Sequence, residues 1–178
     1  MSEHFDSSRR DLMRLAAVAL AATQLPAVAL AASEKSKTTA SLKAGTHTTF
    51  KALKQIDAGL LNVGYAEDGP ADGPAVILLH GWPYDIYSFV DVAPALAAQG
   101  FRVIVPWLRG YGSTHFLSEK TMRNGQPAAV ASDIIALMDA LKIDKAVLAG
   151  FDWGARTADI IAALWPERCN CLLYTSDA

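Results

Sequence analysis

Three short, largely apolar runs constrain the fold of this chain most strongly. They are Ala75–Leu79, Phe101–Val105 and Lys145–Ala149. Runs of this length without apolar–polar alternation are typical of strands that are buried on both faces of a parallel sheet. Segments with apolar residues at helical spacing separate and follow these runs. We therefore predict an α/β fold with a doubly wound, mostly parallel sheet and right-handed crossovers.

Each predicted helix presents one apolar face. The first helix ends at Gly100, a residue type common just after helices, and Pro166 stops the third. Before the first apolar run, residues 51–56 and 60–67 predict a hairpin whose turn is Asp57-Ala58-Gly59. The apolar faces consist of Phe89, Val92, Ala93 and Leu96; of Ala131, Ile134, Ile135, Met138 and Leu141; and of Ala158, Ile161, Ala162 and Trp165.

Composition indicates one ordinary globular domain. The chain has 178 residues, of which 52% are hydrophobic, and a net charge of −2. A chain of this length can bury one sizeable core. A charge so close to zero, with this hydrophobic content, excludes a nucleic-acid partner and general disorder. Cys169 and Cys171 are separated by a single residue, so they indicate neither a disulfide nor a metal site.

Residues 1–31 resemble a bacterial twin-arginine export signal. Arg9 and Arg10 precede an apolar stretch that starts at Leu15, and small residues in an A-x-A arrangement close it at 29–31. Polar residues and a proline interrupt the stretch, which favours a cleaved signal over its alternative, an uncleaved membrane anchor. The resemblance implies that the twin-arginine export machinery is a partner. It also implies an exported protein, periplasmic or secreted, whose mature form has no stable membrane span.

Three further segments follow the predicted signal. Residues 32–49 are rich in Ser, Thr and Lys without periodicity and are expected to be a linker. Residues 50–170 are expected to be the folded domain. Residues 171–178, CLLYTSDA, resemble the translation of a sequencing adapter, and we expect them to be a non-native tail. The alternative for this tail is a genuine strand, which CLLYT could also form.

Unusual residues follow each of the three apolar runs. The first run leads into residues 80–83 (HGWP), the second into residues 106–114 (PWLRGYGST) and the third into residues 150–154 (GFDWG). Ligands of parallel sheets bind beyond the carboxyl ends of the strands, where these three loops would converge. The sequence therefore predicts one site at this edge of the sheet.

The spacing Gly150-x-Asp152-x-Gly154 is that of a strand-to-helix elbow, which usually presents a serine. A carboxylate that attacks an acyl carbon gives an unfavourable anhydride. Displacement at an sp3 carbon instead gives a stable alkyl ester that water can hydrolyse. The predicted electrophile is therefore an epoxide or a carbon–halogen bond. The alternative role for Asp152 is that of a helix N-cap, which aspartate also favours.

Residues 50–170 resemble the α/β-hydrolases, and within them the epoxide hydrolases and haloalkane dehalogenases that use an aspartate nucleophile. The motifs HGWP, RGYGS and GxDWG carry the resemblance in this order and spacing. It implies the N-terminal half of an α/β-hydrolase fold, with the lid and the C-terminal part missing. It also implies Asp152 as the nucleophile, the backbone N–H groups of Trp82 and Trp153 as the oxyanion hole, and neither a metal nor a cofactor.

The same resemblance implies roles for the remaining loop residues around a small apolar organic substrate and water. His80 is expected to hydrogen-bond within its loop, and Arg109 and Tyr111 to brace theirs. The chain has no histidine after Asp152, where this family has its general base, so we expect the fragment to be inactive alone. The residues expected to bind substrate or support its pocket are His80, Gly81, Pro83, Trp107, Phe151 and, as a weaker candidate, Arg156.

These expectations leave three functions open. The first is an epoxide hydrolase-like enzyme, which HGWP and RGYGS favour. The second is a haloalkane or haloacid dehalogenase with the same Asp152 nucleophile. Arg156 matches the arginine that binds the substrate carboxylate in fluoroacetate-type dehalogenases, although it could instead pair with an acid such as Asp159. The third is a non-catalytic relative that binds a small apolar ligand.

Overall fold

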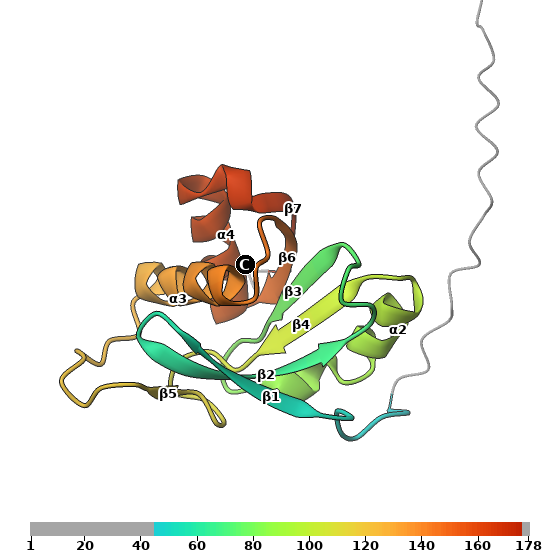
Figure 1. The fold of residues 1–178 in the computed structure, drawn as a ribbon, viewed down its shortest axis with the longest axis horizontal. Coiled ribbons are helices and arrows are strands. Elements are labelled where there is room, and N and C mark those ends of the chain that lie inside the picture. The colour runs from blue at the N-terminus through green and yellow to red at the C-terminus, as the bar shows by residue number, and fades with distance from the viewer. Residues whose placement is uncertain (1–44, 176–178) are drawn as a thin grey trace, which may run out of the picture. The chain divides into compact units, whose positions relative to one another are not determined.

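The computed structural model describes residues 45–175, which are coloured in Figure 1. The predicted export signal, most of the predicted linker and the last three residues of the predicted tail lie outside the described residues. One seven-stranded sheet organises the described part. The strands are β1 (Leu53–Ala58), β2 (Leu61–Asp68), β3 (Ala75–Leu79), β4 (Arg102–Pro106), β5 (His115–Phe116), β6 (Ala146–Phe151) and β7 (Cys169–Thr175). The helices are α2 (Val92–Ala98), α3 (Pro127–Ala140) and α4 (Trp153–Leu164), with the short 3-10 turns η2 (Ile86–Phe89) and η3 (Pro166–Arg168).

Most of the sheet is parallel, as predicted. Strands β4, β3, β6 and β7 lie side by side in that order, and each neighbouring pair is parallel. β1 and β2 form an antiparallel hairpin whose second strand pairs with β4, and β5 adds to β2. The carboxyl ends of β3, β4 and β6 therefore lie at one edge of the sheet, where the three loops with unusual residues begin.

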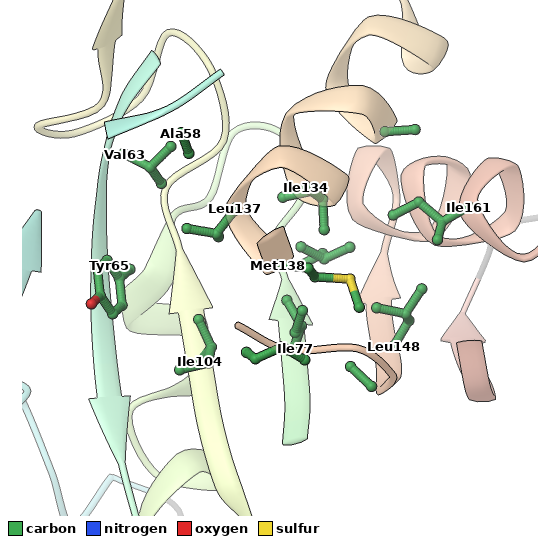
Figure 2. Packing of buried hydrophobic residues seen from close by; sticks show 14 of the residues in the cluster. Ala58, Val63, Tyr65, Ile77, Ile104, Ile134, Leu137, Met138, Leu148 and Ile161 are labelled. Atoms are coloured by element: carbon green, nitrogen blue, oxygen red, sulfur yellow. The ribbon is translucent and has the colours of Figure 1, made fainter. Parts of the chain in front are cut away.

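Helices cover both faces of the parallel strands (Figure 1). On β3, Ile77 and Leu79 belong to a core shared with α3 and α4, whereas Val76 and Leu78 belong to a core shared with η2 and α2. Figure 2 shows the first core, to which α3 contributes Met138. Because both faces of β3 are buried, its sequence has no polar position.

The hairpin turn is shifted from its predicted position. β1 continues through Asp57 and Ala58, and Ala58 pairs with Leu61, so that the turn consists of Gly59 and Leu60. Gly59 has a φ of +59°, which two-residue hairpin turns require and which glycine adopts without strain. The prediction of Asp57-Ala58-Gly59 as the turn was therefore wrong, since only Gly59 belongs to it.

The first predicted helix is divided into two elements. η2 ends at Phe89 and α2 begins at Val92, so residues 90 and 91 interrupt the helix. η2 is a 3-10 turn, and such turns seldom continue beyond four residues. The predicted apolar face is nevertheless confirmed, because Ala93 is buried and Phe89, Val92 and Leu96 pack against the same core.

The last described residues form a strand. Residues 171–175 of the predicted tail continue β7 from Cys169 and pair in parallel with β6. The strand considered as the alternative for this segment matches its conformation, and most of its side chains are exposed at the edge of the sheet. Within residues 45–175, no helix has the length and apolar content needed to cross a membrane.

Candidate active site

Asp152 lies on the turn between β6 and α4. β6 ends at Phe151 and α4 begins at Trp153, so this one residue makes the connection. The Asp152 backbone has φ 51° and ψ −117°, a conformation that is costly for a residue with a side chain. A sharp strand-to-helix turn of this kind exposes its side chain at the carboxyl edge of the sheet.

Glycines on either side make this turn possible. A Cβ atom at Gly150 would lie 2.6 Å from the carbonyl carbon of Gly154, and a Cβ atom at Gly154 would clash with the carbonyl oxygen of Leu79. The turn and the end of β3 are therefore packed backbone against backbone. This contact gives the Gly-x-Asp-x-Gly spacing a steric reason that is independent of any chemistry at Asp152.

The loop after β3 reaches the Asp152 carboxylate directly. The Trp82 N–H donates a hydrogen bond to Asp152 Oδ1 over 2.8 Å, and Pro83 follows through a cis peptide bond. A Cβ atom at Gly81 would lie 2.5 Å from the Cβ atom of Asp152, so only glycine lets the loop approach this closely. The carboxylate makes no capping hydrogen bond to α4, so the alternative role of its side chain as a helix N-cap is not observed.

Trp153 carries the second N–H group expected at the site. It is the first residue of α4, and N–H groups in the first turn of a helix have no carbonyl partner within that helix. These groups also form the positive end of the helix dipole. The Trp82 N–H, from the loop after β3, is hydrogen-bonded to Asp152, and Trp153 directly follows Asp152 at the start of α4.

His80 is fully buried and connects two loops. Its Nε2 accepts a hydrogen bond from the Leu108 N–H over 3.1 Å, and its Nδ1 lies 3.3 Å from the carbonyl oxygen of Gly81. Burial lowers the pKa of the imidazole, and a neutral ring that accepts at Nε2 carries its proton at Nδ1. His80 therefore holds the loop after β3 to the loop after β4. This is the hydrogen-bonding role expected from the sequence, and the ring has no exposed surface in the described part of the chain.

Tyr111, from the loop after β4, packs against the His80 ring. The two rings meet edge to face, with centroids 4.7 Å apart. Burial raises the pKa of the Tyr111 phenol, and the negative charge of Asp152 raises it further. Tyr111 and Trp153 both line a hollow of about 140 Å3 beside the turn.

Aromatic side chains gather around Phe151, the residue before Asp152. The centroid of its ring lies 5.9 Å from that of Tyr84 and 5.7 Å from that of Phe89. Trp82 and Tyr84 remain 67% and 60% exposed. Large exposed apolar side chains that gather on one surface are typical of binding sites. Tyr84 is a candidate contact that the sequence reasoning missed, although its place directly after the HGWP motif could have indicated it.

Trp107 is buried in a core against which Phe89 packs. Its side chain is only 7% exposed and packs against Tyr87, with ring centroids 6.4 Å apart. A Cβ atom at Gly112 would clash with the indole, so the loop after β4 closes tightly over Trp107. The Trp107 indole therefore supports the loop after β4 and has almost no exposed surface in the described part of the chain.

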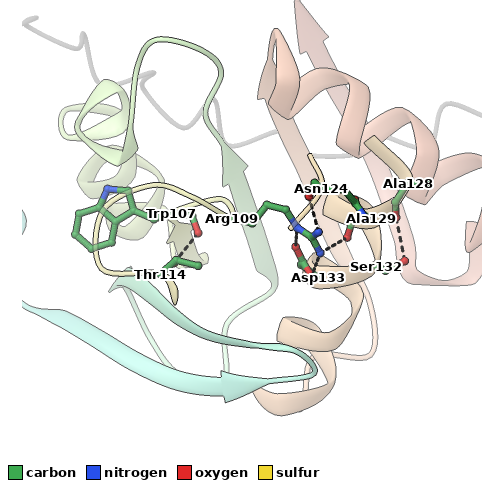
Figure 3. A network of polar contacts seen from close by, with 8 residues as sticks. All are labelled: Trp107, Arg109, Thr114, Asn124, Ala128, Ala129, Ser132 and Asp133. Atoms are coloured by element: carbon green, nitrogen blue, oxygen red, sulfur yellow. Dashed lines mark hydrogen bonds and ion pairs between the residues drawn. The ribbon is translucent and has the colours of Figure 1, made fainter. Parts of the chain in front are cut away.

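Arg109 fastens the loop after β4 to α3 (Figure 3). Its guanidinium donates to both carboxylate oxygens of Asp133, with Nε–Oδ2 and Nη2–Oδ1 distances of 2.6 and 2.7 Å. The carbonyl oxygens of Asn124 and Ala129 accept further hydrogen bonds from it. Both charged side chains are buried, so each depends on the other for compensation. This geometry gives Arg109 the bracing role expected from the sequence.

Arg156 lies one helical turn after Asp152 and is exposed. Its Cζ atom is 5.4 Å from the centroid of the Trp153 ring, which makes a cation–π contact. The expected alternative, a pairing with Asp159, does not occur in the described part of the chain. The two residues lie on one turn of α4, but the arginine reaches back toward the start of the helix, as helical side chains do.

The two carboxylate oxygens of Asp152 have different surroundings. Oδ1 of Asp152 is held by a backbone N–H, and no donor among residues 45–175 is hydrogen-bonded to Oδ2. A carboxylate held in this way can attack a carbon through Oδ2. No three His, Cys, Asp or Glu side chains within the same residues lie close enough together to hold a metal ion.

Comparison with known proteins places similar sequences among the epoxide hydrolases. The chain is 41% identical over 124 residues to an epoxide hydrolase of Caballeronia sordidicola, a match that covers 70% of this chain and 37% of that protein. It is 39% identical over 105 residues to epoxide hydrolase B of Mycobacterium tuberculosis, a match that covers 57% of this chain and 29% of that protein. The chain thus spans little more than a third of the first relative.

A solved structure is similar over the same region. It is a crystal structure from Klebsiella pneumoniae, provisionally described as an epoxide hydrolase, with 67% sequence identity and a TM-score of 0.68. The match covers 69% of this chain and 41% of that one. In addition, the model of a protein family described as alpha/beta hydrolase fold matches residues 74–176, which is more than half of the chain. The chain therefore belongs to the alpha/beta hydrolase fold family.

Proposed function

We propose that the protein opens epoxides through an ester on Asp152. The observation that carries this proposal is the hydrogen bond from the Trp82 N–H to Asp152 Oδ1, on a turn that holds the carboxylate at the edge of the sheet. The bond fixes one oxygen and leaves the other for attack. Relatives named as epoxide hydrolases support the same chemistry. A small apolar epoxide suits the aromatic side chains around Phe151.

In the first step, Asp152 Oδ2 attacks one carbon of the three-membered ring. A new carbon–oxygen bond forms while the ring carbon–oxygen bond breaks. The electron pair of the broken bond leaves on the ring oxygen, which takes up a proton. The product is an alkyl ester of Asp152 whose carbonyl oxygen is Oδ1, in place for the hydrogen bond from Trp82.

In the second step, water attacks the Asp152 carbonyl carbon of the ester. Negative charge develops on Oδ1, and the Trp82 N–H already lies 2.8 Å from that atom. The Trp153 N–H, at the positive end of α4, is the second proposed donor. Collapse of the intermediate breaks the bond between Cγ and the alkyl oxygen. The departing alkoxide takes the proton of the new carboxyl group, which releases a diol and restores the carboxylate. Losing one donor of this kind typically costs about 100–1000-fold in rate.

The proposal requires a base for the water and an acid for the ring oxygen. His80 is enclosed between two loops, while His47 and His115 are exposed and make their contacts elsewhere. None of these three histidines is hydrogen-bonded or ion-paired to Asp152 in the described part of the chain. We assign both groups to a region of a longer protein outside residues 45–175, in keeping with the 37% of the Caballeronia relative that the match covers.

Ester formation on the isolated chain tests the proposal. At mildly acidic pH, where buffer acid can protonate the ring oxygen, we expect the chain to gain the mass of one styrene oxide molecule, because the ester then forms and no histidine among residues 45–175 is hydrogen-bonded at Asp152 to promote its hydrolysis. Peptide mapping by mass spectrometry should place the added mass on Asp152. Asp152→Asn is the matched control, since asparagine keeps the shape of the side chain and tolerates positive φ. A folded wild-type chain that stays unmodified, or an equal adduct on the variant, would contradict the proposal.

Arg156 supports a second candidate, the dehalogenation of a small halogenated acid. Its guanidinium has no ion pair among residues 45–175 and lies over Trp153, next to Asp152. A carboxylate bound there would present its halogenated carbon to Asp152, and the same ester would form with loss of halide. Halide release from chloroacetate, abolished by Arg156→Gln, would favour this candidate. Binding of apolar ligands without any adduct would instead favour the non-catalytic relative.

We further propose that residues 1–31 direct export by the twin-arginine machinery, to the periplasm or beyond. Arg9, Arg10 and the A-x-A arrangement at 29–31 support this proposal. In a bacterial host, the wild-type chain should appear shortened in the periplasmic fraction. Replacing both arginines by lysine should keep it full-length in the cytoplasm, and a wild-type chain retained there would contradict the proposal.

A further inference from the structure

A second hollow, which Asp152 does not line, lies between β5 and the loop that precedes α3. Its volume is about 400 Å3, and its walls include Arg109, His115, Phe116, Arg123 and Asn124. The described residues that line it include two guanidinium groups and no acidic side chain. Asp133 compensates the charge of Arg109, so the unbalanced positive charge of these walls comes from Arg123 and favours a negatively charged occupant.

The two arginines share an aromatic ring but differ in their partners. The Cζ atoms of Arg109 and Arg123 lie 5.5 and 4.7 Å from the centroid of Phe116. Arg109 gives its hydrogen bonds to Asp133 and to carbonyl oxygens (Figure 3). Arg123 is exposed and has no hydrogen bond or ion pair within residues 45–175. Its guanidinium, placed by Phe116, therefore keeps its five N–H donors for another molecule.

The start of α3 adds positive potential at the same place. The helix has 14 residues, its N-cap Gln126 makes no side-chain capping hydrogen bond, and no acid occupies its first turn. Pro127 has no N–H and the Ala129 N–H donates to the Gln126 carbonyl oxygen, so the helix contributes the positive end of its dipole rather than a set of free donors. Gly125, directly before the N-cap, belongs to the wall of the hollow. Helix end and Arg123 thus act on the same space.

Asn124 contributes an unpartnered polar atom. Its Oδ1 is buried and has no hydrogen-bond partner among the described residues. Most buried polar atoms in folded proteins have a partner, and a bound molecule is one way to supply it. An occupant that carries an O–H or N–H group beside its negative charge would satisfy this oxygen.

We propose that this hollow binds a small oxyanion, a carboxylate or a phosphate group, through Arg123. A guanidinium donates to two oxygens side by side, the geometry that suits both groups. The N-terminal end of α3 stabilises the same charge, and Asn124 Oδ1 accepts from a neighbouring O–H or N–H of the ligand. The site does not involve Asp152, so it stands or falls independently of the proposed function.

Titration of the full chain with inorganic phosphate and with glycolate, whose hydroxyl lies beside its carboxylate, tests the site at constant ionic strength. Calorimetry should show saturable binding of at least one anion. Arg123→Gln should weaken that binding about tenfold or more, as expected for the loss of charged hydrogen bonds. Lys120→Gln removes the same charge from an exposed residue outside the hollow, and should change binding less than about twofold. Binding of phosphate alone, or of glycolate alone, identifies the group.

A second pair of variants tests the hollow without altering Arg123. A Cβ atom at Gly125 would meet no atom within 4 Å, so Gly125→Glu and Gly125→Gln both have room to fold. The glutamate should abolish anion binding through its charge, whereas the glutamine should leave most of it. The proposal is overturned if the wild-type chain binds neither anion, if Lys120→Gln acts like Arg123→Gln, or if the two Gly125 variants behave alike.

Discussion

At the scale of single residues, Asp152 has a backbone conformation that costs about 1–3 kcal/mol for residues of its kind, so its neighbours must hold it there. Gly150 and Gly154 let the turn close on itself and on the end of β3. Gly81 lets the next loop press against the Asp152 side chain. The close contacts at these three glycines therefore hold Asp152 in its unfavourable backbone conformation. The same few atoms determine both the local stability and the position of the carboxylate.

Gly154→Ala tests whether these contacts are as tight as the structure indicates. Alanine in a helix is normally more stable than glycine by about 1 kcal/mol. At Gly154 a Cβ atom would clash with the carbonyl oxygen of Leu79, so we expect the free energy of unfolding to fall by about 1–3 kcal/mol instead. Urea unfolding measures this difference. Gly125→Ala, whose Cβ meets nothing within 4 Å, should be neutral or slightly stabilising, and a stabilising Gly154→Ala would contradict the packing.

The environment of Asp152 could be predicted because turns of this kind require glycines at fixed positions. His80 could be predicted as a hydrogen-bonding residue for a similar reason, since it directly precedes Gly81 in the HGWP motif. The burial of Trp107 could not be predicted, because it depends on Tyr87, which lies 20 residues earlier in the chain. The direction of the Arg156 side chain could not be predicted either, because no local sequence pattern distinguishes packing on Trp153 from extension into solvent.

At the scale of elements, one carboxylate ties β2 to both of its longer neighbours. Glu67 accepts hydrogen bonds from Lys54 of β1 over 2.6 Å and from Arg102 of β4 over 2.7 Å. Burial acts to raise the pKa of Glu67, but the two cations outweigh it, so the pKa lies below its ordinary value. At pH values between the folded-state pKa of Glu67 and its ordinary pKa, the folded chain binds fewer protons at Glu67 than the unfolded chain. The stabilisation is therefore present above the ordinary pKa and is lost as the pH falls.

Glu67→Gln should lower the free energy of unfolding by about 1–2 kcal/mol at pH 7, because both cations lose their charged partner. The difference from wild type should shrink as the pH falls below the ordinary pKa of 4.5, where the wild-type carboxyl also becomes protonated. Urea unfolding at a series of pH values measures this convergence. Glu119→Gln, an exposed acid, should have little effect at any pH, and a Glu67→Gln effect independent of pH would exclude the charge as its cause.

Element by element, the strands buried on both faces were the most predictable. The run 75–79 coincides with β3, because burial on both faces leaves no polar residue to confuse the pattern. β5 has only two residues and is defined by its pairing with β2, so no periodicity could indicate it. The division between η2 and α2 was also missed, because both elements keep their apolar residues on the same face.

At the scale of the whole described part, the sheet edge that carries Asp152 could be predicted, because parallel strands with helical crossovers bring their carboxyl ends together. The order of the strands could not be predicted. β2 pairs with β4 although β3 comes between them in the chain, and this exchange is decided by long-range packing. The three loops that meet could be identified from the carboxyl edge of the sheet alone, without the order of the strands.

The strand order also leaves β7 at the margin of the described sheet, with β6 as its strand partner on one side only. Leu173 and Tyr174 on this strand are 59% and 54% exposed. An open strand edge with apolar side chains is a template for pairing with another chain, so we expect association that increases with concentration in sedimentation velocity experiments.

Leu173→Lys should weaken the association constant about 10–100-fold, whereas Met122→Lys, which changes a 77% exposed loop residue, should not. Equal effects of the two substitutions would mean that general hydrophobicity, and not the β7 edge, drives the contact; a monomeric wild-type chain would mean that the edge is already protected.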